Sequence, residues 1–192
     1  MTSENYRDLA DDVASIMIDE AQIQARVSEL AAEIEADYLD EEDLLLICVL
    51  KGGYVFLADL SRSLSRPHQL DFMGISSYGK GTKSSGAVQI IMDLKAPITD
   101  RNVLIVEDII DSGRTLEYMR QNLLARGPAS LRICALLSKP SRREIDVPVN
   151  YTGFEIPDEF VVGYGLDFAE EYRNLPYIAV LKPAVFEYIF DE

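Results

Sequence analysis

Two kinds of hydrophobic pattern alternate along the chain. Leu44–Leu50 and Val103–Val106 are apolar runs that no polar residue interrupts, and Leu131–Leu137 is apolar except for Arg132. Runs of this kind are typical of strands buried on both faces of a parallel sheet. Between and before them lie segments in which hydrophobic residues recur every three or four positions, as in an amphipathic helix.

The periodic segments predict the helices. From Ile23 to Tyr38 the apolar positions follow helical spacing, and Asp19 precedes them as a candidate N-cap. Gly127 and Pro128 mark the end of a later helix. The expected helices are 20–38, 54–65 and 116–125. Because strands and helices alternate, the chain is expected to form an α/β fold with a mostly parallel, twisted sheet flanked by helices.

Other segments are predicted to lie at the margin of this sheet. Gln69–Tyr78 and Val88–Leu94 indicate a pair of strands, and the glycine- and serine-rich Gly79–Gly86 between them predicts a long mobile loop. The pair would form a hairpin that reaches beyond the sheet. Thr152–Tyr164 carries glycines and a proline between short apolar pieces, which indicates short strands and turns that form a flap over the end of the sheet.

Composition narrows the class of protein. The chain has 192 residues, 48% of them hydrophobic, which fits one globular domain. Its net charge is −15, most of it carried by residues 1–43. A strongly acidic chain argues against binding to nucleic acid or to an anionic membrane, since both need a basic face. No apolar stretch is long enough to cross a bilayer, so we expect a cytoplasmic protein.

The cysteines and the histidine exclude further chemistries. Cys48 and Cys134 lie in apolar runs, which predicts buried free thiols in a reducing compartment. With His68 as the only histidine, a zinc cage is not expected. His68 follows a proline at the start of a predicted strand, so it is interpreted as a histidine of a surface turn.

The run VLIVEDIIDSGRTL, residues 103–116, carries the strongest chemical signal. Ligands of open α/β sheets bind beyond the carboxyl ends of the strands, and here a buried strand delivers Glu107 and Asp108 to that edge. Burying two adjacent carboxylates costs several kcal/mol unless they find partners. Hydroxyl donors or a divalent cation would be suitable partners for the two carboxylates.

The following turn predicts a phosphate site. Ser112, Gly113, Arg114 and Thr115 would direct free amides into one hollow at the positive end of a helix. A carboxylate pair beside such a hollow matches a ribose 5-phosphate, with the diol on the acids and the phosphate on the amides. The alternative is a strand end with capping residues and solvated acids. The run is neither a Walker A loop nor a dinucleotide fingerprint.

This run resembles the phosphoribosyl-pyrophosphate signature of type I phosphoribosyltransferases. Four further segments, in order, resemble hypoxanthine-guanine phosphoribosyltransferases of the bacterial type: LKGGYVF (50–56), SSYG (76–79), LLSKP (136–140) and GFEIPDEFVVGYGLDFAEEYRNLPY (153–177). The resemblance implies one phosphoribosyltransferase domain over residues 1–192. Its core would span about 40–150, its hood the N-terminal segment and about 151–192, and a flexible hairpin would serve as lid.

The implied reaction is purine salvage. A 6-oxopurine, hypoxanthine or guanine, would join through N9 to the 5-phosphoribosyl group of phosphoribosyl pyrophosphate, with Mg²⁺, to give IMP or GMP and pyrophosphate. Xanthine stays open as a base, whereas the segments that carry the resemblance disfavour adenine and pyrimidines. A regulatory protein that binds RNA on this fold would need a basic face. The resemblance also implies a homodimer or homotetramer.

The resemblance assigns roles to residues of the quoted segments. Asp111 would act as general acid/base near purine N7, with an N-cap as its alternative role. The implied ligands of phosphoribosyl pyrophosphate are Lys51, Gly52, Glu107, Asp108, Asp111, Ser112, Gly113, Arg114, Thr115 and Arg173. The implied purine contacts are Lys139, Phe160, Val161 and Asp167. The implied lid pair is Ser77 and Tyr78. The implied metal site is Glu107, Asp108 and Asp167. Leu50–Lys51 would be a cis peptide.

Overall fold

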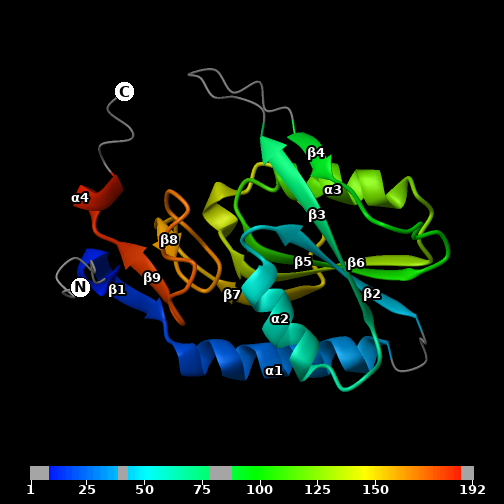
Figure 1. The fold of residues 1–192 in the computed structure, drawn as a ribbon, viewed down its shortest axis with the longest axis horizontal. Coiled ribbons are helices and arrows are strands. Elements are labelled where there is room, and N and C mark those ends of the chain that lie inside the picture. Colours follow the sequence, from blue (N-terminus) through cyan, green and yellow to red (C-terminus); the bar gives the residue numbers. More distant parts are fainter. Residues whose placement is uncertain (1–8, 39–42, 78–87, 187–192) are drawn as a thin grey trace, which may run out of the picture.

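A six-stranded sheet forms the centre of the molecule in the computed structural model, which describes residues 9–38, 43–77 and 88–186 (Figure 1). The strand order is β4-β3-β2-β5-β6-β7, and only the β3–β4 pair is antiparallel. The α/β class and the predicted hairpin pairing are therefore confirmed. The strands are β2 (Leu44–Leu50), β3 (Gln69–Ser77), β4 (Val88–Met92), β5 (Asn102–Ile110), β6 (Ser130–Ser138) and β7 (Tyr151–Glu155).

Helices cover both faces of this sheet. Along β2, Leu44, Leu46 and Cys48 belong to the same buried cluster as side chains of α1 and α2, while the intervening residues pack with α3. This double burial explains why the strand shows no polar alternation. The helices are α1 (Glu20–Asp37), α2 (Tyr54–Ser63) and α3 (Arg114–Leu124), close to their predicted ranges.

The helix starts follow local hydrogen bonding. At α1 the Asp19 carboxylate accepts from the Gln22 amide at 2.8 Å, and the Gln22 side chain accepts from the Asp19 amide at 3.0 Å. This capping box confirms the predicted N-cap. At α3 the N-cap is Gly113 rather than Asp111, so the capping role considered for Asp111 is wrong and its carboxylate is available for other contacts.

A second, three-stranded sheet stands at one end of the molecule (Figure 1). It has the order β1-β9-β8, with antiparallel neighbours, and packs around Phe168 and Tyr172; we call this region the hood. The prediction of a flap over Thr152–Tyr164 was wrong for β7, which pairs with β6 and completes the parallel sheet. The remaining elements are η1 (Leu9–Asp12), β1 (Val13–Ile18), η2 (Pro140–Arg142), β8 (Val161–Val162), β9 (Ile178–Leu181) and α4 (Pro183–Phe186).

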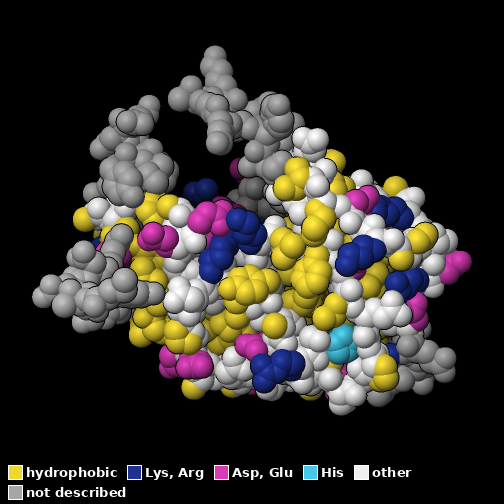
Figure 2. Space-filling view, viewed as in Figure 1, with side chains coloured by type: hydrophobic (Ala, Val, Ile, Leu, Met, Phe, Trp, Pro, Cys, Tyr) yellow, Lys and Arg dark blue, Asp and Glu magenta, His cyan; other side chains and the backbone are white. Residues whose placement is uncertain are grey.

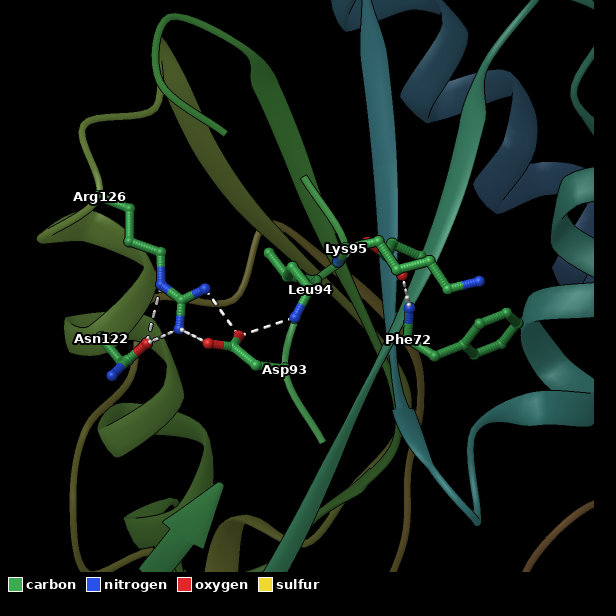
Figure 3. A network of polar contacts seen from close by, with 7 residues as sticks. Phe72, Asp93, Leu94, Lys95, Asn122 and Arg126 are labelled. Atoms are coloured by element: carbon green, nitrogen blue, oxygen red, sulfur yellow. Dashed lines mark hydrogen bonds and ion pairs between the residues drawn. The ribbon is translucent and has the colours of Figure 1, made fainter. Parts of the chain in front are cut away.

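Side-chain networks fix the edges of the core. Arg126, beyond the end of α3, makes two contacts with the Asp93 carboxylate after β4, at 2.7 and 3.1 Å, and also donates to Asn122 (Figure 3). The hood is joined to the core by Tyr164, whose hydroxyl donates to the Asp59 carboxylate of α2 at 2.7 Å. The polar contacts thus hold together elements that lie far apart in the sequence.

The two cysteines and the histidine have the environments that the sequence predicted. Cys48 and Cys134 are buried free thiols, as predicted, and burial raises the pKa of both. His68 precedes β3 at the amino end of the parallel strands; its Nδ1 donates to the Arg66 carbonyl and its Nε2 contacts Ser61 Oγ. Among the helices that the structure describes, none is long and apolar enough to cross a membrane.

Candidate active site

The residues predicted to form a site lie where the parallel strands end. Residues 51–53 follow β2, Asp111 follows β5, and Lys139 follows β6. The last two loops are directly joined, because the Lys139 amide donates to the Ile110 carbonyl at 2.9 Å. The carboxyl edge of one sheet therefore brings together three segments that the sequence separates by more than 25 residues each.

Glu107 and Asp108 lie within β5, which continues to Ile110 instead of ending at Val106 as predicted. Glu107 is only 9% exposed, and its Oε2 has no hydrogen-bond partner among the described residues. Desolvation and the neighbouring Asp108 charge raise the pKa of Glu107 well above its usual range. Desolvation also raises the pKa of Asp108 to about 6. Such a pair favours a cationic or hydroxyl partner.

The loop after β2 lies directly against this pair. A Cβ built on Gly52 would lie 1.5 Å from Asp108 Oδ2, so the carboxylate occupies space that only glycine leaves free. The Leu50–Lys51 peptide bond is cis, as the resemblance implied. The loop and the acids therefore form one wall of the site.

The turn of residues 112–115 is the segment predicted to form an anion hollow. Gly113 has φ +84°, and a Cβ there would lie 2.5 Å from the Ile145 carbonyl oxygen. The Ser112 carbonyl accepts from the amides of Glu144 and Ile145 at 3.0 and 3.1 Å, which fixes the turn. Within the described part of the chain, no hydrogen bond is donated by the amides of Gly113 and Thr115.

The acids and the turn share one hollow of about 180 Å³. Its wall is made by Glu107, Asp108, Ile109, Ile110, Asp111, Ser112, Gly113, Thr115 and Leu116. Arg114 does not line it, since its guanidinium pairs with Glu144. The combination predicted from the sequence, two carboxylates beside free amides, is thus present in the structure.

Asp111 and Lys139 belong to a chain of four alternating charges. Arg142 Nε lies 3.1 Å from Asp111 Oδ1, and its Nη1 lies 3.5 Å from Asp158 Oδ2. The Lys139 ammonium, 11% exposed, lies 3.8 Å from the other Asp158 oxygen. Arg142 and Asp158 were not predicted from the sequence; the one signal for Arg142 is its position three residues after Lys139.

The other predicted purine contacts belong to the hood. Phe160 packs edge-to-face on Phe168, with ring centroids 5.6 Å apart. Val161 is buried in β8, opposite Val180 of β9. Ser77 ends β3 at the same edge of the core sheet, while Tyr78 and the Gly79–Gly86 loop lie outside the described residues. The lid therefore stays a prediction.

A second cluster of charges joins the hood to the loop after β2. Arg173, 16% exposed, lies 2.9 Å from Asp167 Oδ1 and donates to the Gly165 carbonyl at 2.8 Å. Glu170 contacts both Arg173 and Lys51. The structure thus brings together three predicted residues, Lys51, Asp167 and Arg173. Glu170 was missed, because nothing in its sequence context distinguishes it from an ordinary surface acid.

No group of three histidine, cysteine or acidic side chains within the described ranges could hold a metal ion by itself. Asp167 is near enough to Asp108 for its charge to raise the Asp108 pKa, but it is paired with Arg173. The donor set that fits Mg²⁺ is Glu107 with Asp108, two hard oxygen ligands; Arg173 is near enough to lower the pKa of Asp108 but forms its ion pairs with Asp167 and Glu170. Mg²⁺ ordinarily completes such a site with substrate oxygens and water.

Comparison with known proteins decides the family. The family described as "Phosphoribosyl transferase domain" matches residues 17–169. This chain belongs to the phosphoribosyltransferase family. Hypoxanthine-guanine phosphoribosyltransferase of Mycobacterium avium is 50% identical over 181 residues, 92% of this chain and 89% of the relative. Hypoxanthine phosphoribosyltransferase of Escherichia coli K12 is 53% identical over 164 residues, 85% of this chain and 92% of the relative.

Solved structures show the same fold. A crystal structure of a hypoxanthine phosphoribosyltransferase from Staphylococcus aureus matches with a TM-score of 0.89 and 44% identity, over 95% of this chain and 99% of that one. The type I phosphoribosyltransferase fold predicted from the motifs is therefore confirmed.

Proposed function

We propose that this phosphoribosyltransferase is a Mg²⁺-dependent enzyme of purine salvage. It transfers the 5-phosphoribosyl group of phosphoribosyl pyrophosphate to N9 of hypoxanthine or guanine, giving IMP or GMP and pyrophosphate. The observation that carries the proposal is the hollow at the end of β5, in which two buried acids that form no ion pair with a described side chain adjoin the free amides of Gly113 and Thr115. That arrangement is complementary to a ribose ring with a phosphate at one end.

Each half of the hollow has a distinct task. Glu107 and Asp108 accept hydrogen bonds from the ribose diol, and the amides of Ser112–Thr115 bind the 5-phosphate at the positive end of α3. Because Arg114 is held by Glu144, the phosphate is bound chiefly by backbone and hydroxyl groups.

Mg²⁺ is proposed as the cofactor. Glu107 and Asp108 would hold it together with substrate oxygens, and Asp167 would take part on the pyrophosphate side if it exchanged Arg173 for the ion. When bound, the ion would neutralise part of the charge on the departing pyrophosphate.

The reaction breaks the bond from C1′ to the pyrophosphate oxygen and forms the bond from C1′ to N9, and one proton leaves the purine. Asp111, which lines the hollow and is 45% exposed at its side chain, would exchange that proton at N7. Lys139 would donate to the purine O6, Phe160 would stack on the ring, and the Val161 backbone would contact its edge. Lys51, Gly52 and Arg173 would bind the pyrophosphoryl group, and Ser77 with Tyr78 would close over it.

The proposal extends to organisation. Residues 1–192 would act as one domain, and the protein would work in the cytoplasm as a homodimer or homotetramer. Hydrophobic side chains gather near the centre of the face in Figure 2, in the region of α2, β3 and β4. Tyr54, Leu70, Ile91 and Met92 are 43%, 45%, 66% and 41% exposed. An apolar area of this kind favours contact with another subunit.

A direct assay tests the function. The protein is mixed with phosphoribosyl pyrophosphate, Mg²⁺ and one nucleobase at a time, and the monophosphate product is followed by chromatography. Hypoxanthine or guanine should give product, whereas adenine and uracil should give none. The rate with xanthine measures how strictly the site discriminates between the exocyclic groups of the base. Excess chelator should abolish turnover. If none of the 6-oxopurines gave product, or if the protein kept full activity in chelator, the proposal would be overturned.

A further inference from the structure

One carboxylate oxygen bridges two cations at the pocket beside the hood. Glu170 Oε2 lies 2.9 Å from the Lys51 ammonium and 3.1 Å from Arg173 Nη2. All three residues line one pocket of about 590 Å³, together with Leu50, Tyr54 and Phe72. The two cations come from separate elements, the loop after β2 and the hood, and within the described structure Glu170 is the group that joins them.

The turn of residues 167–173 holds Glu170 in place. The backbone φ angle of Glu170 is +68°, a conformation that residues other than glycine adopt only when their surroundings fix it. Its amide donates to Asp167 Oδ2 at 3.0 Å, and the other Asp167 oxygen contacts Arg173. The backbone therefore presents the Glu170 carboxylate to the same guanidinium that Asp167 orients.

Carboxylate and phosphoryl oxygens are equivalent partners for ammonium and guanidinium groups. We propose that Glu170 occupies, in the ligand-free protein, the position of a pyrophosphate oxygen between Lys51 and Arg173 and competes with the pyrophosphoryl group for both. The inference rests on the proposed function, which assigns these two cations to pyrophosphate.

The competition is weak enough to be reversible. Glu170 and Lys51 are each 64% exposed at their side chains, and exposed ion pairs contribute little to stability. The pyrophosphoryl group, which carries more charge, can displace the carboxylate. When pyrophosphate is the product, the Glu170 carboxylate competes with it for the same two cations. Glu170 therefore lowers the affinity for the product as well as for the substrate.

Binding of inorganic pyrophosphate in the presence of Mg²⁺, measured by isothermal titration calorimetry on the full chain, tests this role. Glu170→Gln should bind pyrophosphate about 3- to 10-fold more tightly than wild type, the range expected for loss of two exposed pairs. Glu171→Gln is the matched control, because it removes the same charge from a neighbouring residue. Glu171 lines a different hollow, together with Asp12 and Lys182. The control variant should bind like wild type.

Glu170→Asp separates contact from general charge. It keeps the negative charge but is shorter by one methylene, so it cannot bridge both cations and should also bind pyrophosphate more tightly. Wild-type affinity in Glu170→Asp, equal gains in Glu171→Gln, or weaker binding in Glu170→Gln would overturn the inference. If the wild-type protein itself bound no pyrophosphate and formed no nucleotide, the proposed function would fail instead.

Discussion

Two charged regions of the molecule are organised in opposite ways. At the carboxyl edge of the core sheet, Glu107 and Asp108 are adjacent buried acids that form no ion pair with any described side chain, and the amides of Gly113 and Thr115 donate no hydrogen bond within the described chain. In the hood, Arg173 is satisfied by Asp167 and Glu170. On the proposed function, the difference indicates that the core sheet keeps the sugar-phosphate half of the site open, whereas the charges of the pyrophosphate half neutralise one another until the ligand binds.

The largest effect is expected at Asp111. Asp111→Asn keeps the shape of the residue but removes the proton acceptor, so kcat should fall by about 100-fold or more while the affinity for phosphoribosyl pyrophosphate stays similar. Steady-state kinetics with calorimetry measures both. Asp158→Asn is the control, because it removes the other acid that contacts Arg142. Turnover at the wild-type rate in Asp111→Asn would remove Asp111 from proton transfer.

A smaller effect is expected when the open region loses its turn geometry. Gly113→Ala places a Cβ 2.5 Å from the Ile145 carbonyl at a φ of +84°. The turn must shift, so KM for phosphoribosyl pyrophosphate should rise about 10-fold, with a loss of stability of about 1–3 kcal/mol. Gly127→Ala shares the positive φ but meets only Thr99 Cγ2 at 3.9 Å. It should lose some stability with KM unchanged; an equal rise in KM would show that the turn geometry is not specific to phosphate binding.

The buried acids should limit the stability of the ligand-free protein. The pKa of Asp108 is raised in the folded state to about 6 from an ordinary value near 4, so ionisation disfavours folding as the pH rises through this window. Asp108→Asn should therefore raise Tm by about 2–6 °C above pH 6, and this gain should vanish below about pH 4. Differential scanning calorimetry across this range measures it.

Asp146→Asn removes the same charge from an exposed site and serves as the control for Asp108→Asn. Asp108→Asn should also bind phosphoribosyl pyrophosphate less tightly. A Tm gain that is equal for both variants, or independent of pH, would contradict the claim that burial raises the pKa of Asp108.

The smallest effect is expected at Arg114. Its side chain pairs with Glu144 outside the hollow, so Arg114→Lys should leave KM for phosphoribosyl pyrophosphate within about twofold of wild type. Initial-rate kinetics at saturating hypoxanthine measures it. A tenfold rise would mean that the guanidinium, and not the backbone, binds the phosphate.

The sequence predicted the core better than the hood for a physical reason. Leu44–Leu50 is buried on both faces, so an uninterrupted apolar run identified β2 with its observed bounds. β1 was not predicted, because it is mostly exposed and pairs with β9, more than 150 residues away. β7 was predicted to belong to a flap for a related reason, since the short sequence of this strand does not indicate that it pairs with β6.

The site shows the same division. Glu107, Asp108 and the 112–115 turn were predicted together because they lie in one continuous segment, and the structure places them around one hollow. The contacts of Glu170 were not predictable. They depend on a turn in which Ala169, Glu170 and Tyr172 all adopt positive φ without being glycine, and on a partner, Lys51, from the far side of the sequence.

A crystal structure of the protein with IMP and Mg²⁺ would show whether the hollow at the end of β5 binds a sugar phosphate. Phosphate oxygens should lie at hydrogen-bond distance, about 2.7–3.2 Å, from the amides of residues 112–115, and the ribose hydroxyls should face Glu107 and Asp108. A nucleotide whose phosphate binds elsewhere, with both acids left out of contact with the sugar, would contradict the proposed mode of binding.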